Sequence, residues 1–197
     1  MSAAIENFEK SLTLKRNQSD VNELAISITI TNLAFCYQTS GQLDRALVLY
    51  EEAFTIRTKV LPSFHPSLAL VMRRLSSCYL QQGRVDRAML LAMDALDVAS
   101  SSLPSKHPDL GWYLNSAASC HRNSRSFDEA IRLYKRAADI FSHHLRTEAA
   151  SLSVVNHNLA VLYNKFGQND KAVELITESI KIQKETLPEN HPSIAHC

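Results

Sequence analysis

The sequence repeats itself with a period of about 42 residues. The tripeptide His-Pro-Ser or His-Pro-Asp begins at His65, His107 and His191, so that one period separates the first two copies and two periods separate the last two. A fixed period of this length is typical of stacked supersecondary units, each of which buries its apolar face against a neighbour. The chain is therefore predicted to form a repeat array rather than one closed core, and an array favours recognition of a partner.

The same register holds between the tripeptides. A turn position carries glycine at 41, 83 and 167 and Arg125 in the third copy, and an aspartate follows three residues later at Asp44, Asp86, Asp128 and Asp170. Four full units are visible, at about residues 23–64, 65–106, 107–148 and 149–190. The second half of a preceding unit occupies residues 1–19, and the start of a further unit occupies residues 191–197. No low-complexity linker interrupts them, so we expect a single domain over residues 1–197.

Each unit is predicted to contain two helices. In the first helix of the first full unit, Ile26, Ile30, Leu33 and Tyr37 follow a helical period. The second helix is expected from about residue 44 to residue 61. The glycine between them supplies the positive φ of a tight turn, and the aspartate suits the start of the second helix, where the helix dipole favours a carboxylate. The predicted fold class is all-α.

The details of this pattern resemble a known family. Leu33-Ala34-x-x-Tyr37, followed by Ala46-x-x-x-Tyr50-x-x-Ala53, is similar to the tetratricopeptide repeat motif, whose usual length is about 34 residues. A longer second helix and an L-P-x-x-H-P linker account for the greater length of the repeat here. This longer form resembles the repeats of kinesin light chains and of nephrocystin-3-like scaffold proteins. The resemblance covers nearly the whole chain and implies a right-handed α-solenoid of helix-turn-helix repeats.

Two features depart from the kinesin light chain pattern. Those proteins usually have glycine after the leucine of the linker, where this chain has proline at 62, 104 and 188. They also carry an N-terminal coiled coil, and this sequence shows no heptads. Within the chain, the third unit is the least typical, with Arg125 at the turn and 146–149 in place of Pro-x-x-His. A left-handed conformation at Arg125 would cost roughly 1 kcal/mol, and we expect the junction of the third and fourth units to be irregular.

Composition and the ends of the chain exclude several classes of protein. Twenty-one basic residues balance 20 acidic ones, which argues against binding to nucleic acid or to an anionic membrane. No apolar run is long enough for a membrane span, and the first ten residues lack the apolar core of a signal peptide. Internal repeats need polar caps, and neither end of the array supplies one. We therefore expect the chain to be a segment of a longer array or a shortened gene model, and we expect its uncapped ends to expose apolar surface and to self-associate.

The cysteines, which are the main candidates for a metal-binding or redox site, follow the repeat period. Cys36, Cys78 and Cys120 lie one full period apart, at the same place in successive first helices, where cysteine acts as a small apolar residue. Zinc ligands cluster far more closely, and unpaired thiols favour the cytoplasm. The His143-His144 pair is expected in the last turn of a second helix. No phosphate loop or nucleophile elbow is present, so we predict no catalysis, no cofactor and no metal.

The remaining candidates are the side chains that would line the concave groove formed by the first helices. In the family that the chain resembles, equivalent positions form four rows across the groove: Ile28, Leu70, Trp112 and Val154; Thr31, Arg73, Asn115 and His157; Phe35, Ser77, Ser119 and Val161; Gln38, Leu80, Arg122 and Asn164. An apolar row beside a polar row suits an extended or helical peptide.

Trp112, the sole tryptophan, is the candidate hot spot of this groove; the alternative is that it packs on a neighbouring helix. Arg73 and Arg122 could pair with acidic side chains of a partner, or could be solvated surface charges. Some chaperone-binding repeat proteins hold a carboxylate with lysine, asparagine and arginine, and here only Arg73 and Asn115 are of that kind, which disfavours that partner class.

The sequence therefore predicts a non-catalytic interaction module, an adaptor or scaffold that binds a protein or peptide partner of unknown identity in the groove. Two alternatives stay open. The array could be a structural spacer or self-assembly segment, or it could be the sensor array of a larger enzyme or signalling ATPase.

Overall fold

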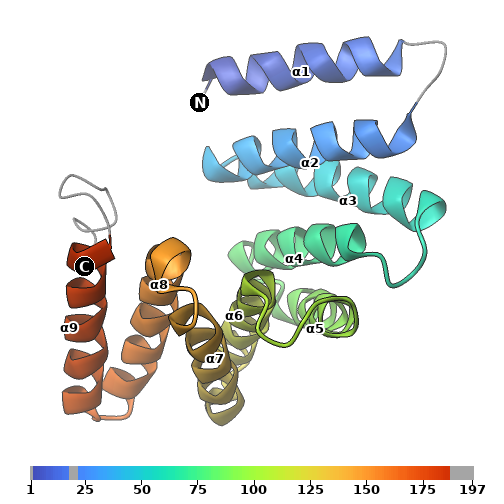
Figure 1. The fold of residues 1–197 in the computed structure, drawn as a ribbon. Coiled ribbons are helices and arrows are strands. Elements are labelled where there is room, and N and C mark those ends of the chain that lie inside the picture. Colours follow the sequence, from blue (N-terminus) through green and yellow to red (C-terminus); the bar gives the residue numbers. More distant parts are fainter. Residues whose placement is uncertain (1, 18–21, 187–197) are drawn as a thin grey trace. The chain divides into compact units, whose positions relative to one another are not determined.

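The computed structural model describes residues 2–17 and 22–186 (Figure 1). The residues described form nine α-helices and no strand, which confirms the all-α prediction. The helices are α1 (Ser2–Arg16), α2 (Glu23–Thr39), α3 (Leu43–Val60), α4 (Pro66–Gln81), α5 (Val85–Ser102), α6 (Pro108–Asn123), α7 (Phe127–Ser142), α8 (Leu145–Lys165) and α9 (Asn169–Thr186). They form two compact units, the N-terminal unit Met1–Ser102 and the C-terminal unit Leu103–Cys197.

In the N-terminal unit, helices pair as the period predicts. Helix α2 packs on α3 and α4 packs on α5, while α1 contacts α2 and α3 contacts α4. The close approach depends on small residues, since Ala34, Ala46 and Ala53 are all fully buried between helices. The largest side chain buried with them is Tyr50 of α3, which has no exposed surface.

The C-terminal unit repeats the arrangement with α6 on α7, α7 on α8 and α8 on α9. Its core contains Leu114, Leu133, Tyr134, Phe141 and Leu162, each at most 1% exposed. Tyr134 occupies the register position of Tyr50, and both are fully buried. In each unit, therefore, the regular spacing of the repeat puts equivalent residues into equivalent cores.

The turn inside each repeat adopts the predicted left-handed conformation. Gly41, Gly83 and Gly167 have φ angles of 80°, 75° and 71°, and Arg125 has a φ of 64°. The same backbone bond closes the turn in each case, and in the third repeat it joins Ser126 N to His121 O at 2.9 Å. Arg125 thus takes the conformation that glycine takes elsewhere, because the helix ending requires it.

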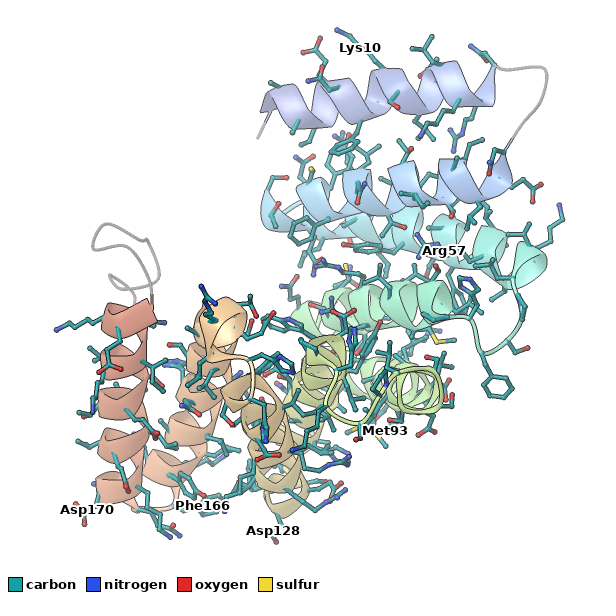
Figure 2. All side chains as sticks on the ribbon, viewed as in Figure 1. Lys10, Arg57, Met93, Asp128, Phe166 and Asp170 are labelled. Atoms are coloured by element: carbon teal, nitrogen blue, oxygen red, sulfur yellow. The ribbon has the colours of Figure 1, made fainter. Side chains whose placement is uncertain are left out.

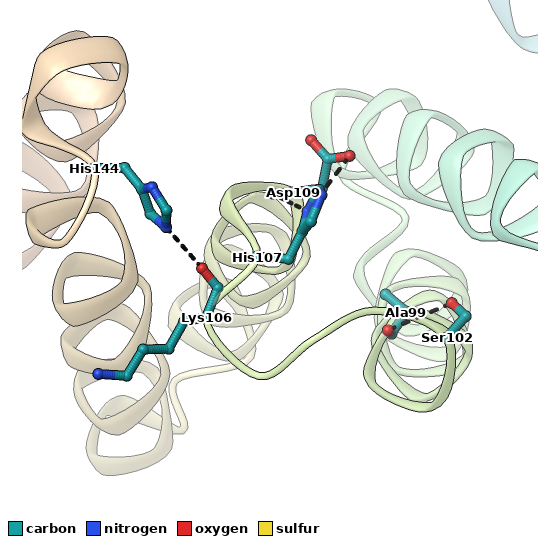
Figure 3. Close-up of polar contacts among 6 residues, drawn as sticks. All are labelled: Ala99, Ser102, Lys106, His107, Asp109 and His144. Carbon is teal, nitrogen blue, oxygen red and sulfur yellow. Dashed lines mark hydrogen bonds and ion pairs between the residues drawn. The ribbon is translucent and has the colours of Figure 1, made fainter.

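The linker histidines cap the following helices. His65 Nδ1 accepts a hydrogen bond from the backbone N–H of Ser67 at 3.1 Å, and His107 Nδ1 accepts one from Asp109 at 3.2 Å (Figure 3). The proline after each histidine occupies the first helical turn, as its fixed φ and missing N–H favour. The predicted helix-start role of these two histidines is confirmed. His191 lies outside the described residues.

The junction between α7 and α8 is irregular, as expected for the third unit. No extended linker separates the helices, and Glu148 interrupts α8 with φ −116° and ψ 16°. His144 Nε2 lies 2.9 Å from the carbonyl oxygen of Lys106 (Figure 3). His143 is the C-cap residue of α7, with helical dihedral angles, close to its predicted place in the last turn of that helix. The same prediction was wrong for His144, which is the N-cap residue of α8.

Candidate functional site

Within each unit, the first helices of two successive repeats bring predicted groove residues together. In the N-terminal unit we call the surface containing Ile28, Phe35, Gln38, Leu70, Arg73 and Ser77 the α2–α4 face. In the C-terminal unit the α6–α8 face contains Trp112, Asn115, Ser119, Arg122, His157, Val161 and Asn164. A side-chain hydrogen bond joins the two helices of each face, from Gln38 to Ser77 in one and from Asn158 to Asn115 in the other.

The α2–α4 face exposes apolar side chains beside arginines. Ile28 is 49% exposed, Phe35 41% and Leu70 37%. The guanidinium carbon of Arg74 lies 4.4 Å from the centre of the Phe35 ring, a distance at which the ring attracts a cation. Arg73, the preceding residue of α4, is half-buried. The sequence reasoning had not singled out Arg74.

A hydrogen-bond network fixes the polar part of this face. Gln38 Nε2 donates to Ser77 Oγ at 3.2 Å and to Gln81 Oε1 at 3.1 Å. The hydroxyl of Tyr50, which reaches up from α3, donates to Gln38 Oε1 at 3.0 Å. Burial raises the pKa of Tyr50, so its hydroxyl remains a donor. The amide of Gln38 is thus held at both ends, and it links the two first helices.

Thr31 does not line the α2–α4 face, which corrects its place among the groove candidates. It is 6% exposed, and its hydroxyl donates to the Ser27 carbonyl at 2.7 Å. The guanidinium of Arg57, which Figure 2 labels on α3, donates to Thr31 Oγ1 at 2.9 Å. Arg57 also bonds Ser27 Oγ at 3.1 Å and the carbonyl of Ser67 at 2.6 Å.

Arg57 is 2% exposed, and burial lowers the pKa of its guanidinium. Sequence reasoning missed it, although one signal was available. Its register equivalents are Lys15 in the preceding half unit and Ala99, Phe141 and Gln183 in the later units, so the position changes from charged to uncharged along the array.

The α6–α8 face is mainly polar, and its side chains bind one another. Asn158 Nδ2 donates to Asn115 Oδ1 at 3.2 Å, and Arg122 donates to Asn158 Oδ1 at 3.3 Å. Ser119 Oγ lies 2.9 Å from the hydroxyl of Tyr134. Asn158 was not among the predicted residues, yet it joins α8 to α6. As at Gln38, these polar side chains form hydrogen bonds that join the two first helices of the unit.

Three further predicted residues lie on α8, where they border an open hollow. His157, Val161 and Asn164 line this hollow of about 390 Å³ together with Val173 and Ile176 of α9. All three are exposed, Val161 by 44%. Ile176 is half-buried, whereas its register equivalents Tyr50 and Tyr134 are fully buried.

Trp112 packs against the neighbouring helix while keeping part of its surface exposed. Its ring meets Phe141 of α7 edge to face, with 5.4 Å between centres and planes at 63°. The residue is half-buried. Trp112 therefore packs on a neighbouring helix, which was the alternative to a binding role, and part of its surface is still exposed.

Other chemistry has little support among the residues described. They contain no group of three or more His, Cys, Asp or Glu side chains placed to hold a metal ion. Cys78 and Cys120 are fully buried and Cys36 is half-buried, as expected of small apolar residues. In the same described part, no helix combines the length and the apolarity needed to cross a bilayer.

Comparison with known proteins decides the family. Two family models described as tetratricopeptide repeat match residues 23–101 and 157–193. The crystal structure of the nearly identical TPR-like repeats of a putative kinesin light chain from Podosopora anserina is 30% identical, with a TM-score of 0.74 over 89% of this chain and 82% of that one. The chain belongs to the tetratricopeptide repeat family. Its repeats are of the kinesin light chain type, and they form a helical repeat solenoid.

Two other similarities are more limited. A Rap protein solved in complex with competence and sporulation factor matches 92% of this chain and 48% of its own, at 19% identity and a TM-score of 0.79, which shows the fold alone. The photosystem I assembly protein Ycf3 of Synechococcus is 42% identical over 50 residues, a match that spans 25% of this chain and 26% of that protein. Tetratricopeptide repeats of this kind are protein-interaction modules, and the chain is one of them.

Proposed function

We propose that this repeat array is a non-catalytic adaptor or scaffold, and that each unit offers a peptide segment of a cytoplasmic protein partner its own binding surface, the α2–α4 face in one and the α6–α8 face in the other. The observation that carries the proposal is the composition of these faces, where exposed apolar side chains stand beside anchored hydrogen-bonding groups. Apolar positions give a peptide affinity and polar positions fix its register. The contact residues are those of the two faces as defined above.

Charge on the α2–α4 face favours a partner segment with an acidic side chain. Arg73 and Arg74 lie on α4, and Glu23 is the one Asp or Glu in the sequences of α2 and α4. Glu23 pairs with Lys59 at 3.1 Å, which offsets its charge. A carboxylate of the partner would therefore meet arginine donors without a competing acid on these helices. Arg122 offers a similar donor on the α6–α8 face.

The direct test is affinity capture from a cell extract with the intact array beside the variant Trp112→Ala/Arg73→Glu. A matched control, Leu90→Ala/Arg136→Glu, makes the same kinds of change at exposed positions of the second helices α5 and α7. We expect partners to be lost with the first variant and kept with the second, while circular dichroism shows both folded. Retention of all partners by the first variant would exclude these residues from binding.

A second candidate is self-association through the α8–α9 end, because its hollow exposes Val173 by 64% and Val161 by 44%. Light scattering over a concentration series should show a growing mass that Val173→Glu suppresses. A constant monomer mass in both proteins would reject this candidate.

A further inference from the structure

One buried position differs in chemistry from repeat to repeat and lies directly beneath the first helix. On α3, α5, α7 and α9 it is Arg57, Ala99, Phe141 and Gln183, each at most 2% exposed, and its equivalent on α1 is the half-buried Lys15. The position thirty residues earlier, on the first helices, is Ser27, Ala69, Gly111 and Ser153, all buried small residues. We call these the support position and the seat position. Two of the support residues, Arg57 and Phe141, contact the seats opposite them.

In the C-terminal unit the fit of support to seat is steric. A Cβ atom added to Gly111 would lie 2.6 Å from Cζ and 2.8 Å from Cε1 of Phe141, closer than real Cβ contacts allow. The Phe141 ring therefore lies against the backbone of α6, and only glycine accepts it there. Because Trp112 follows Gly111 directly, the same ring also meets the indole edge to face at 5.4 Å. Phe141 thus contacts both the seat and the adjoining groove residue.

In the N-terminal unit the fit is polar, and it involves a different position of the first helix. Arg57 bonds the seat Ser27 at 3.1 Å and reaches the groove candidate Thr31 at 2.9 Å. That contact engages the Thr31 hydroxyl below the surface, where the residue is 6% exposed. Phe141 therefore contacts the residue that directly follows its seat, whereas Arg57 contacts the residue four positions after its seat.

We propose that Phe141, packed against Gly111, sets the orientation of Trp112. Phe141 is a positioning residue, since it is fully buried and can touch no partner. Aromatic pairs have a preferred edge-to-face geometry, so the ring restricts the indole to one arrangement before a partner arrives. Such preorganisation lowers the cost of ordering on binding. The biological consequence rests on the proposed function, whereas the orientation itself does not.

Trp112 is the sole tryptophan, so its orientation can be measured without knowing the partner. The variant Gly111→Ala/Phe141→Ala reproduces the Ala69 and Ala99 pair of the second repeat. We expect it to raise the acrylamide quenching constant of Trp112 at least about twofold and to remove most of the near-ultraviolet dichroism of the indole, because the aromatic neighbour is gone. Phe141→Leu keeps an apolar side chain and should change the quenching and the dichroism of Trp112 by an intermediate amount. It tests the positioning role if the double variant does not fold.

The control is Leu133→Ala, also fully buried on α7 but about 12 Å away along the helix. It should weaken the core while leaving both Trp112 signals unchanged. Unchanged signals in folded Phe141 variants, or an equal change in the control, would overturn the positioning role. Affinity capture distinguishes binding through Trp112 from its positioning by Phe141. If capture of partners requires Trp112 but the quenching and dichroism of Trp112 do not change in the Phe141 variants, only the positioning role fails. If the signals respond but capture survives Trp112→Ala, binding through Trp112 fails and the positioning role stands.

Discussion

Replacing Arg125 by glycine should stabilise the C-terminal unit. Arg125 has a φ of 64° at the turn where Gly167, in the same unit, has a φ of 71°. A Cβ atom built on Gly167 meets nothing within 4 Å, so packing does not complicate the comparison. The two positions therefore isolate the energy of the left-handed backbone, and the reciprocal variants Arg125→Gly and Gly167→Ala form a matched pair.

The expected size follows from two opposing contributions. A left-handed residue with a Cβ costs roughly 1–2 kcal/mol relative to glycine. Glycine also makes the unfolded chain more flexible, which offsets about 0.4–1 kcal/mol. We expect Arg125→Gly to raise the free energy of unfolding by about 0.5–1 kcal/mol, and Gly167→Ala to lower it by a similar amount.

Urea unfolding followed by Trp112 fluorescence measures this difference, because Trp112 belongs to the same unit as both turns. The slope of the transition should stay constant while its midpoint moves, so that the change is one of stability. A neutral or destabilising Arg125→Gly at constant slope would refute the reasoning. A costless Gly167→Ala would show that the turn relaxes out of the left-handed region.

Two further predictions concern buried polar groups. Arg57→Ala should lower the free energy of unfolding of the N-terminal unit by about 3 kcal/mol, since it opens a cavity and removes the donor to the Ser67 carbonyl. Arg57→Met should lower it by only about 1 kcal/mol or less, because the substitution also removes the cost of burying the charge. Urea midpoints compare the two, and equal losses would contradict this account. Burial raises the pKa of Tyr50 and of Tyr134, so their stabilisation is complete below the unfolded value near 10 and is lost as the pH rises through the folded values. Thermal melts should show a smaller alkaline loss in Tyr50→Phe/Tyr134→Phe, and an unchanged loss would reject the assignment.

The sequence by itself determined the features that depend on neighbours along the chain. The repeat register, the helix pairs and the left-handed turn at Arg125 all follow from spacing, because a helix places residues three and four apart on one face and its ending imposes one backbone conformation. The capping role of His65 and His107 is equally local, since each side chain reaches the N–H two residues on. The same reasoning identified which residues could share a face of the first helices.

Only the tertiary structure decided how far each of those residues is buried and which side chains of other helices contact it. Thr31 has the spacing of a groove residue, yet Arg57 of another helix engages it beneath the surface. Trp112 is braced by Phe141, and Asn158 joins two helices through Asn115. Spacing fixes the direction of a side chain on its own helix, whereas burial depends on the reach and volume of side chains from the helix packed against it. Those side chains lie far away in the sequence, and packing alone brings them together.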